Sequence, residues 1–153
     1  MISYREKLWP APWLFVSTAL VIPASLLVFF PINPLAGVVV AIVLYLGCVG
    51  LLLAGSPVVA VTHSDFVAGK ARVPLDLVGE VTGYRATEAR LQRGPHLDAR
   101  AWLMIRGWID PVIRVEILDA NDPVPYWIVS TRRPDTIIEA IAAAKTTQRT
   151  PGR

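Results

Sequence analysis

Few side chains in this 153-residue sequence have the type and spacing that catalysis or metal binding requires. His63, Ser64 and Asp65 are the residue types of a hydrolase triad, but three consecutive residues on one turn point in different directions and cannot align for catalysis. The soft or imidazole metal ligands are His63, His96 and Cys48, and their spacing matches no metal site. We therefore expect no enzymatic activity, no metal and no cofactor.

Other residues that suggest chemistry have structural explanations. Gly79 and Gly83 lie in a strand pattern, and no Gly-Lys-Ser/Thr follows them, so they do not form a phosphate-binding loop. The acids near residues 119–122 are turn formers that hydrogen-bond to the backbone. Trp102 and Trp127 lie in apolar strands and are expected in the core rather than on a ligand-stacking surface.

Charge is more informative, because residues 85–106 carry five arginines and two acids. A basic loop near a membrane attracts anionic lipid headgroups, and the alternative is that these arginines only solvate a surface loop. Trp108, beside Gly107 at a turn, is the expected exposed aromatic residue. The candidate contacts for a lipid or a partner protein are Arg85, Arg90, Arg93, Arg100, Trp108, Arg132 and Arg133. The chain from residue 65 onward is only slightly basic, which argues against nucleic-acid binding.

Two different parts of the chain must position these residues. Charged residues make up 18% of the sequence, yet residues 8–64 contain none and are mostly apolar. A water-exposed surface of that composition would aggregate, whereas a bilayer favours it. This distribution excludes a purely soluble enzyme, a disordered chain and a coiled coil.

The apolar stretch divides at Pro31 to Pro34, where two prolines flank an asparagine and interrupt helical geometry. The segments on either side, residues 11–30 and 35–54, are each long enough to cross a hydrocarbon core of about 30 Å. Pro23 should kink the first span. Trp9 and Trp13 lie where that span should meet the headgroups.

A cleaved signal peptide is the main alternative to a two-span hairpin. The first apolar segment is longer than the apolar core of a usual signal peptide, and a second apolar segment follows it almost at once. Arg5 and Lys7 precede the first span, Lys70 and Arg72 follow the second, and the turn has no basic residue. This asymmetry predicts a multi-pass protein of the cell membrane with both termini in the cytoplasm.

Small residues recur along the second span at the spacing that lets helices pack closely in lipid. The candidate packing residues are Gly37, Ala41, Gly50 and Ala54. They fit packing against the first span of the same chain or against a second copy in a homo-oligomer.

From Pro57 onward the pattern changes to short strands separated by turn residues. Residues 85–100 are polar and are expected to form a loop, with a helical turn near 87–92. The expected strands are 58–63, 66–68, 71–75, 78–84, 101–105, 112–118 and 126–130. We expect residues 57–147 to form an independent cytoplasmic domain, after an N-terminal segment of 1–56 and before a flexible tail of 148–153.

One amphipathic helix should close this domain. Pro134 suits a first helical position, Asp135 lies in the first turn, and Ile137, Ile138 and Ile141 share one face. About six or seven strands in meander order, followed by such a helix, predict a small α+β domain: a bent antiparallel sheet or partly open barrel. The pattern resembles the pleckstrin-homology superfold.

The chain also resembles one protein family. The segments Tyr4-Arg5-Glu6-Lys7-Leu8-Trp9-Pro10 and Ile128-Val129-Ser130-Thr131-Arg132-Arg133-Pro134, together with the two spans, are similar to the uncharacterised actinobacterial two-span membrane proteins of domain-of-unknown-function family three-zero-nine-three. The resemblance covers nearly the whole chain and implies no known activity. The general layout is similar to membrane-anchored bacterial proteins with pleckstrin-homology-like domains, a likeness at the level of fold alone.

Two functions remain for a chain of this design. It is either a non-enzymatic, membrane-anchored interaction module, whose domain binds an unknown protein or an anionic headgroup, or an accessory subunit whose spans pack into a larger membrane complex.

Overall fold

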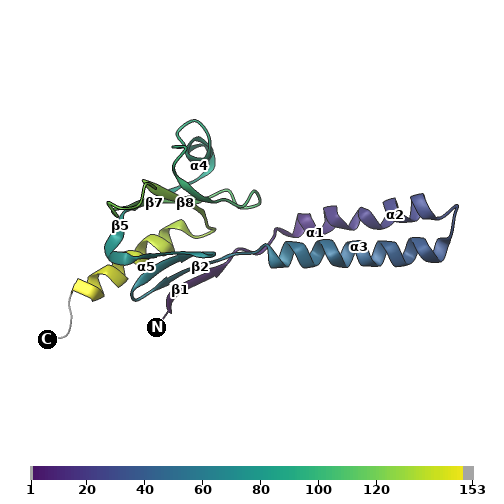
Figure 1. The fold of residues 1–153 in the computed structure, drawn as a ribbon, viewed down its shortest axis with the longest axis horizontal. Coiled ribbons are helices and arrows are strands. Elements are labelled where there is room, and N and C mark those ends of the chain that lie inside the picture. The colour runs from purple at the N-terminus through teal and green to yellow at the C-terminus, as the bar shows by residue number, and fades with distance from the viewer. Residues whose placement is uncertain (1, 150–153) are drawn as a thin grey trace. The chain divides into compact units, whose positions relative to one another are not determined.

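The computed structural model describes residues 2–149 and divides the chain into two compact units (Figure 1). One is an apolar helical hairpin, Trp9–Ser56. The other is a sheet unit that combines the residues up to Leu8 with the chain from Pro57 onward. The prediction counts residues 1–56 as one N-terminal segment that contains the two spans, whereas the structure groups the part of this segment before Trp9 with the sheets.

The hairpin contains two candidate membrane spans, Pro12–Phe29 and Pro34–Ala54. The first consists of two helices, α1 (Pro12–Ala19) and α2 (Val21–Phe29), which meet at Leu20. A proline lacks the N–H that would bond to the carbonyl four residues earlier, and for Pro23 that carbonyl belongs to Ala19, where α1 ends. The interruption expected at Pro23 therefore lies one turn before it.

The turn of the hairpin is fixed by Asn33. Its side-chain oxygen accepts hydrogen bonds from the backbone N–H groups of Leu35 at 3.0 Å and Ala36 at 3.3 Å, which caps the helix α3 (Pro34–Ala54). Pro34 occupies the first turn, where its missing N–H costs no bond.

Sheet A is an antiparallel meander in the order β1-β2-β3-β4. Its strands are β1 (Ile2–Lys7), β2 (Val58–Thr62), β3 (Asp65–Ala68) and β4 (Ala71–Pro74). β1 was not expected from the sequence. It pairs with β2 so that Lys7 lies opposite Val58, and the whole apolar hairpin is thus inserted between two neighbouring strands.

Sheet B has the order β5-β7-β8-β6. Its strands are β5 (Val78–Tyr84), β6 (Trp102–Met104), β7 (Val112–Ile117) and β8 (Tyr126–Ser130). The expected meander is wrong at β6, which lies at the edge and pairs in parallel with β8. A 3-10 turn, η1 (Leu75–Leu77), leads into β5. The helix α4 (Ala86–Arg93) confirms the helical turn expected near 87–92 and extends it at both ends.

The final helix, α5 (Pro134–Arg149), contacts β1, β2, η1 and β5, so it packs against elements of both sheets. Ile137, Ile141 and Ala144 are buried in the main core, as their spacing predicts. The helix also covers the first two residues of the expected tail, and residues 150–153 lie outside the described part. The architecture predicted from the sequence, two apolar helices followed by a small sheet domain with a C-terminal helix, is confirmed, and the sheets are open rather than closed.

Candidate functional site

Glu6 on β1 links the start of the chain to the junction between β8 and α5. Its side chain is half-buried, and Oε2 accepts hydrogen bonds from the hydroxyls of Thr131 at 2.6 Å and Tyr4 at 3.0 Å. Oε1 accepts the backbone N–H of Arg132 at 3.0 Å, while the Thr131 hydroxyl accepts the N–H of Arg133 at 3.1 Å. We call these five residues the Glu6 junction. It unites the two segments, 4–10 and 128–134, on which the family resemblance rests.

The environment of the Glu6 junction perturbs Tyr4. Burial raises the pKa of the Tyr4 hydroxyl to about 12, and the hydrogen bond to Glu6 and its negative charge act in the same direction. A neutral Tyr4 can donate to the carboxylate, whereas a phenolate beside it would repel it. The raised pKa keeps the Tyr4 phenol protonated, so its hydroxyl can donate to Glu6.

The arginines expected to face a ligand are largely engaged within the protein. Arg85 pairs with Asp135 at 2.6 Å, Arg93 with Asp110 at 3.0 Å, and Arg100 with Asp98 at 3.0 Å. Arg90 is exposed, and no ion pair is found for it within the described residues. The excess of positive charge in residues 85–106 is therefore mostly offset by local and distant acids.

These pairs also stabilise α4. Asp110 accepts the backbone N–H of Ala86 at 2.7 Å, which holds Ala86 at φ +48°, and the same carboxylate pairs with Arg93 at the other end of the helix. Hydrogen bonds from Arg100 lower the pKa of Asp98 below its ordinary value. Arg85, Arg93 and Arg100 thus each have an acidic partner within the protein, and their contact with a lipid or a partner protein stays a prediction.

Trp108 differs from the expectation of an exposed aromatic residue. It is half-buried and packs against the main core, and its indole Nε1 is buried without a hydrogen-bond partner. Trp102 and Trp127 lie with ring centroids 4.6 Å apart, and Trp127 is buried, as expected of core residues. Arg132 and Arg133 are both exposed, directly after the Glu6 junction.

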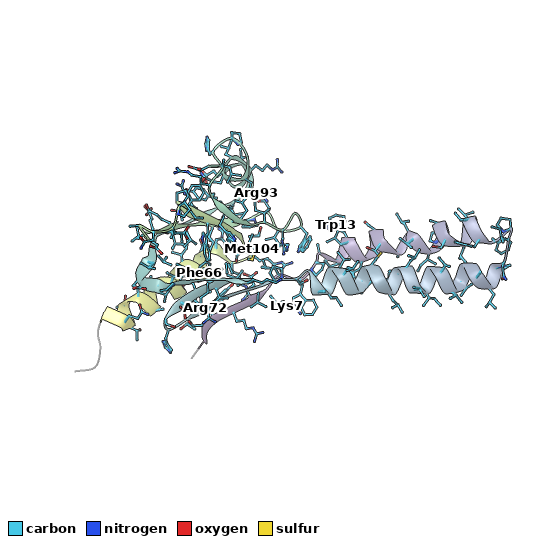
Figure 2. The ribbon with its side chains drawn as sticks, viewed as in Figure 1. Lys7, Trp13, Phe66, Arg72, Arg93 and Met104 are labelled. Atoms are coloured by element: carbon cyan, nitrogen blue, oxygen red, sulfur yellow. The ribbon has the colours of Figure 1, made fainter. Side chains whose placement is uncertain are left out.

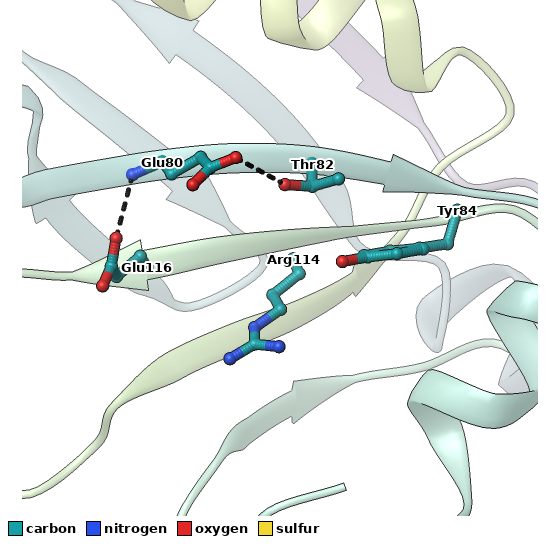
Figure 3. A pocket seen from close by; sticks show the side chains of 5 residues that line it. All are labelled: Glu80, Thr82, Tyr84, Arg114 and Glu116. Atoms are coloured by element: carbon teal, nitrogen blue, oxygen red, sulfur yellow. Dashed lines mark hydrogen bonds between the residues drawn. The ribbon is translucent and has the colours of Figure 1, made fainter. Parts of the chain in front are cut away.

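A second set of polar side chains lines a groove on the outer face of sheet B (Figure 3). The groove has a volume of about 250 Å³, and its lining residues are Glu80, Thr82, Tyr84, Arg114 and Glu116. A β-bulge in β5 lies beside this groove, between Val78 and Val81. There the Glu116 carboxylate accepts the N–H of Glu80 at 3.3 Å. The carboxylate lies so close to the backbone that a Cβ at Gly79 would be 2.7 Å from it.

Arg114 is the distinctive cation of this groove. Its guanidinium lies 4.0 Å from the ring centroid of Tyr126, which belongs to a small second core beneath α4. Within the described part of the chain no ion pair joins Arg114 to Glu80 or Glu116. The groove can therefore present charges of both signs to solvent.

The small residues of α3 fall into two groups. Gly37 and Ala41 are buried, and a Cβ at Gly37 would lie 3.2 Å from that of Phe29, so these two face α2 of the same hairpin. A Cβ at Gly50 would meet no atom within 4 Å, and Ala54 is exposed. Of the two pairs, only Gly37 and Ala41 thus pack against the other span of the same chain.

The residues first considered for catalysis form a turn. The Ser64 hydroxyl donates to the neighbouring Asp65 carboxylate at 2.6 Å, and Thr62 accepts the N–H of Asp65 at 2.9 Å. In residues 2–149 no group of three or more His, Cys, Asp or Glu side chains is placed to hold a metal ion.

Sequence reasoning missed the contacts that Tyr4, Glu6, Thr131 and Arg114 make. One signal for the first two was available: Tyr4, Glu6 and Leu8 alternate with exposed Ser3, Arg5 and Lys7, which is the pattern of a half-buried strand.

Comparison with known proteins gives one match. No curated protein and no solved structure matches the chain. The model of the family described as "Protein of unknown function (DUF3093)" matches residues 3–141, a range that spans β1, both apolar helices, both sheets and the first half of α5. The chain therefore belongs to the DUF3093 family.

Proposed function

We propose that this protein is a non-enzymatic interaction module, anchored by its helical hairpin in the cell membrane and presenting the sheet unit on the cytoplasmic side. The observation that carries this proposal is the pairing of β1 with β2. The strand before the first span and the strand after the second belong to one sheet, so both must lie on the same side of any membrane that the hairpin crosses. A cleaved signal peptide fits poorly, because cleavage would remove a strand and the fully buried Leu8.

The composition of the hairpin surface supports the membrane anchor. Large apolar side chains along both spans are exposed, with Leu27 at 79% and Leu51 at 75%. Such a surface is unfavourable in water and favourable in lipid. The basic residues that flank the spans favour the cytoplasm as the side that holds the sheets.

The experiment is a topology measurement on the full chain. We expect a fluorescent reporter fused after Arg153 to be active and an alkaline phosphatase fused at the same position to be inactive. A second fusion before the first residue should give the same result. Active phosphatase at either end would overturn the proposal, because β1 and β2 would then lie outside the cytoplasm or on opposite sides.

The alternative, an accessory subunit that packs through its spans, is favoured by one observation, the open surface at Gly47 and Gly50. Substitution Gly50→Leu would block a partner helix there and leave the contact with α2 intact, whereas Gly37→Leu would disrupt the hairpin itself. If the module proposal is correct, Gly50→Leu leaves function and any co-purifying complex unchanged. Loss of the complex with a folded Gly50→Leu protein would instead support the accessory subunit or a homo-oligomer.

Replacing both spans by unrelated ones separates the two functions further. A module needs only an anchor, so the exchange should preserve its function. An accessory subunit should lose its function, because its contacts would be removed with the spans.

A further inference from the structure

One end of sheet A gathers cations around the point where the chain enters and leaves the hairpin. The Leu8 N–H donates to the Pro57 carbonyl at 2.9 Å, which closes the sheet between the last residue before the hairpin and the first after it. Lys7 lies opposite Val58 and is exposed (Figure 2). The carbonyl of Val58 accepts the N–H of Gly69 at 2.8 Å, so exposed Lys70 begins the next turn at this same end.

The Glu6 junction adds two more cations. Because Glu6 holds the N–H of Arg132 and Thr131 holds that of Arg133, both arginines are fixed beside the end of β1. Their side chains are exposed. Lys7, Lys70, Arg132 and Arg133 are referred to below as the basic rim.

Three acids connected to the rim residues by hydrogen bonds or by the sequence also bond to other residues of the sheet unit. Glu6 accepts three hydrogen bonds within its junction. Asp135, two residues after Arg133, pairs with Arg85. Asp110 pairs with Arg93, and its neighbour Pro111 receives the N–H of Thr131. Arg85 and Arg93 thus offset the negative charges of Asp135 and Asp110.

Chain connectivity limits how far this rim can lie from the bilayer. Only residues 8–11 separate Lys7 from the start of α1 at Pro12, and an extended chain covers at most about 3.6 Å per residue. Lys7 can therefore be no more than about 18 Å from the first residue of the first span. The hydrocarbon core of a bilayer is about 30 Å thick, and the bilayer with its headgroup layers is about 40–45 Å thick. The headgroup layer on each side is therefore thinner than this distance, so Lys7 can reach it.

We propose that the basic rim binds the phosphate groups of anionic membrane lipids. The inference rests on the proposed function, because it requires the hairpin to span the membrane and the sheet unit to lie at its surface. This proposal differs from a general attraction of one basic loop to the membrane. The four cations come from three segments, which are β1, the β3–β4 turn and the β8–α5 junction. Hydrogen bonds of the backbone hold these segments at one end of the sheet.

The experiment measures lipid binding by the full chain. The protein is purified in a neutral detergent and titrated with phosphatidylglycerol or with phosphatidylcholine, and bound lipids are counted by native mass spectrometry. The test variant carries Lys7→Gln, Lys70→Gln and Arg133→Gln. The matched control removes the same number of charges elsewhere, with Arg72→Gln, Arg90→Gln and Arg100→Gln.

The wild type and the control variant should retain phosphatidylglycerol in preference to phosphatidylcholine. The test variant should bind phosphatidylglycerol at least about tenfold more weakly. A third variant with Lys7→Arg and Lys70→Arg should bind like the wild type, which separates charge from folding. Binding should weaken with added salt, as expected for exposed charges.

Three results would overturn the inference: equal retention of the two lipids by the wild type, equal losses in the test and control variants, or displacement of the lipid by inorganic phosphate at constant ionic strength, which would indicate a site for a soluble phosphate. None of these results bears on the topology measurement. A failed topology measurement would refute the proposed function, whereas correct topology without lipid preference would refute the rim alone.

Discussion

Removal of the Glu6 carboxylate should destabilise the sheet unit strongly. Glu6→Ala leaves the Arg132 N–H and the Thr131 and Tyr4 hydroxyls without their acceptor. A hydrogen bond to a charged group contributes about 1.5–3 kcal/mol net. Because three bonds share one half-buried carboxylate, their contributions do not add fully, and we expect a loss of about 3 kcal/mol in the free energy of unfolding.

The assay is thermal unfolding of the full chain in detergent, followed by tryptophan fluorescence. For a domain of about 100 residues, 1 kcal/mol corresponds to about 4–8 °C, so the midpoint should fall by at least about 10 °C. The control is Glu139→Ala, since Glu139 is exposed on α5 and should change the midpoint little.

A double-mutant cycle tests the mechanism rather than the magnitude. Thr131→Val removes the shortest of the three bonds, at 2.6 Å. If this bond couples the two side chains, the effects of Glu6→Ala and Thr131→Val should fall short of additivity by at least about 0.5 kcal/mol. Strictly additive effects, or a Glu6→Ala protein that melts with the wild type, would refute the account of the junction.

Three further predictions concern α5, the bulge and pH. Ile141→Asp places a charge in the main core and should unfold the sheet unit, while Glu139→Lys should melt like the wild type; equal midpoints for the two would contradict the position of α5. Gly79→Ala should destabilise the sheet through its contact with the Glu116 carboxylate, and Glu116→Ala in the same chain should restore much of the loss, as measured by denaturant unfolding. The Tyr4 pKa is raised, so its contribution to stability is full below pH 10 and is lost as pH rises toward 12; Tyr4→Phe should reduce that decline, and an unchanged profile would count against it.

The hairpin and several strands could be predicted because local sequence determines them. An uncharged apolar stretch broken by Pro31 and Pro34 has few alternatives to two helices. β5 and β8 have the predicted bounds, because each is an apolar segment between turn residues. The face of α5 that contains Ile137 and Ile141 followed from the helical period.

The remaining features depend on partners distant in the sequence. β1 is short and carries Arg5, Glu6 and Lys7, so its alternating pattern is only a weak local signal, and the pairing with β2 is what completes the strand. The ion pair of Arg85 could not be predicted for the same reason, since its partner Asp135 lies fifty residues away. A count of charges along the chain cannot reveal such a pair.

The insertion of the hairpin between β1 and β2 sets an order on folding. During synthesis β1 is made first, but it has no partner until residues 58–62 have followed the whole hairpin. Closing a long flexible loop costs entropy, and a formed helical hairpin reduces that cost by bringing its two ends together. In a chain whose hairpin is not formed, pairing β1 with β2, burying Leu8 and making the Glu6 junction would cost more entropy. A formed hairpin thus favours completion of the sheet unit, so the stability of the sheet unit depends in part on the hairpin.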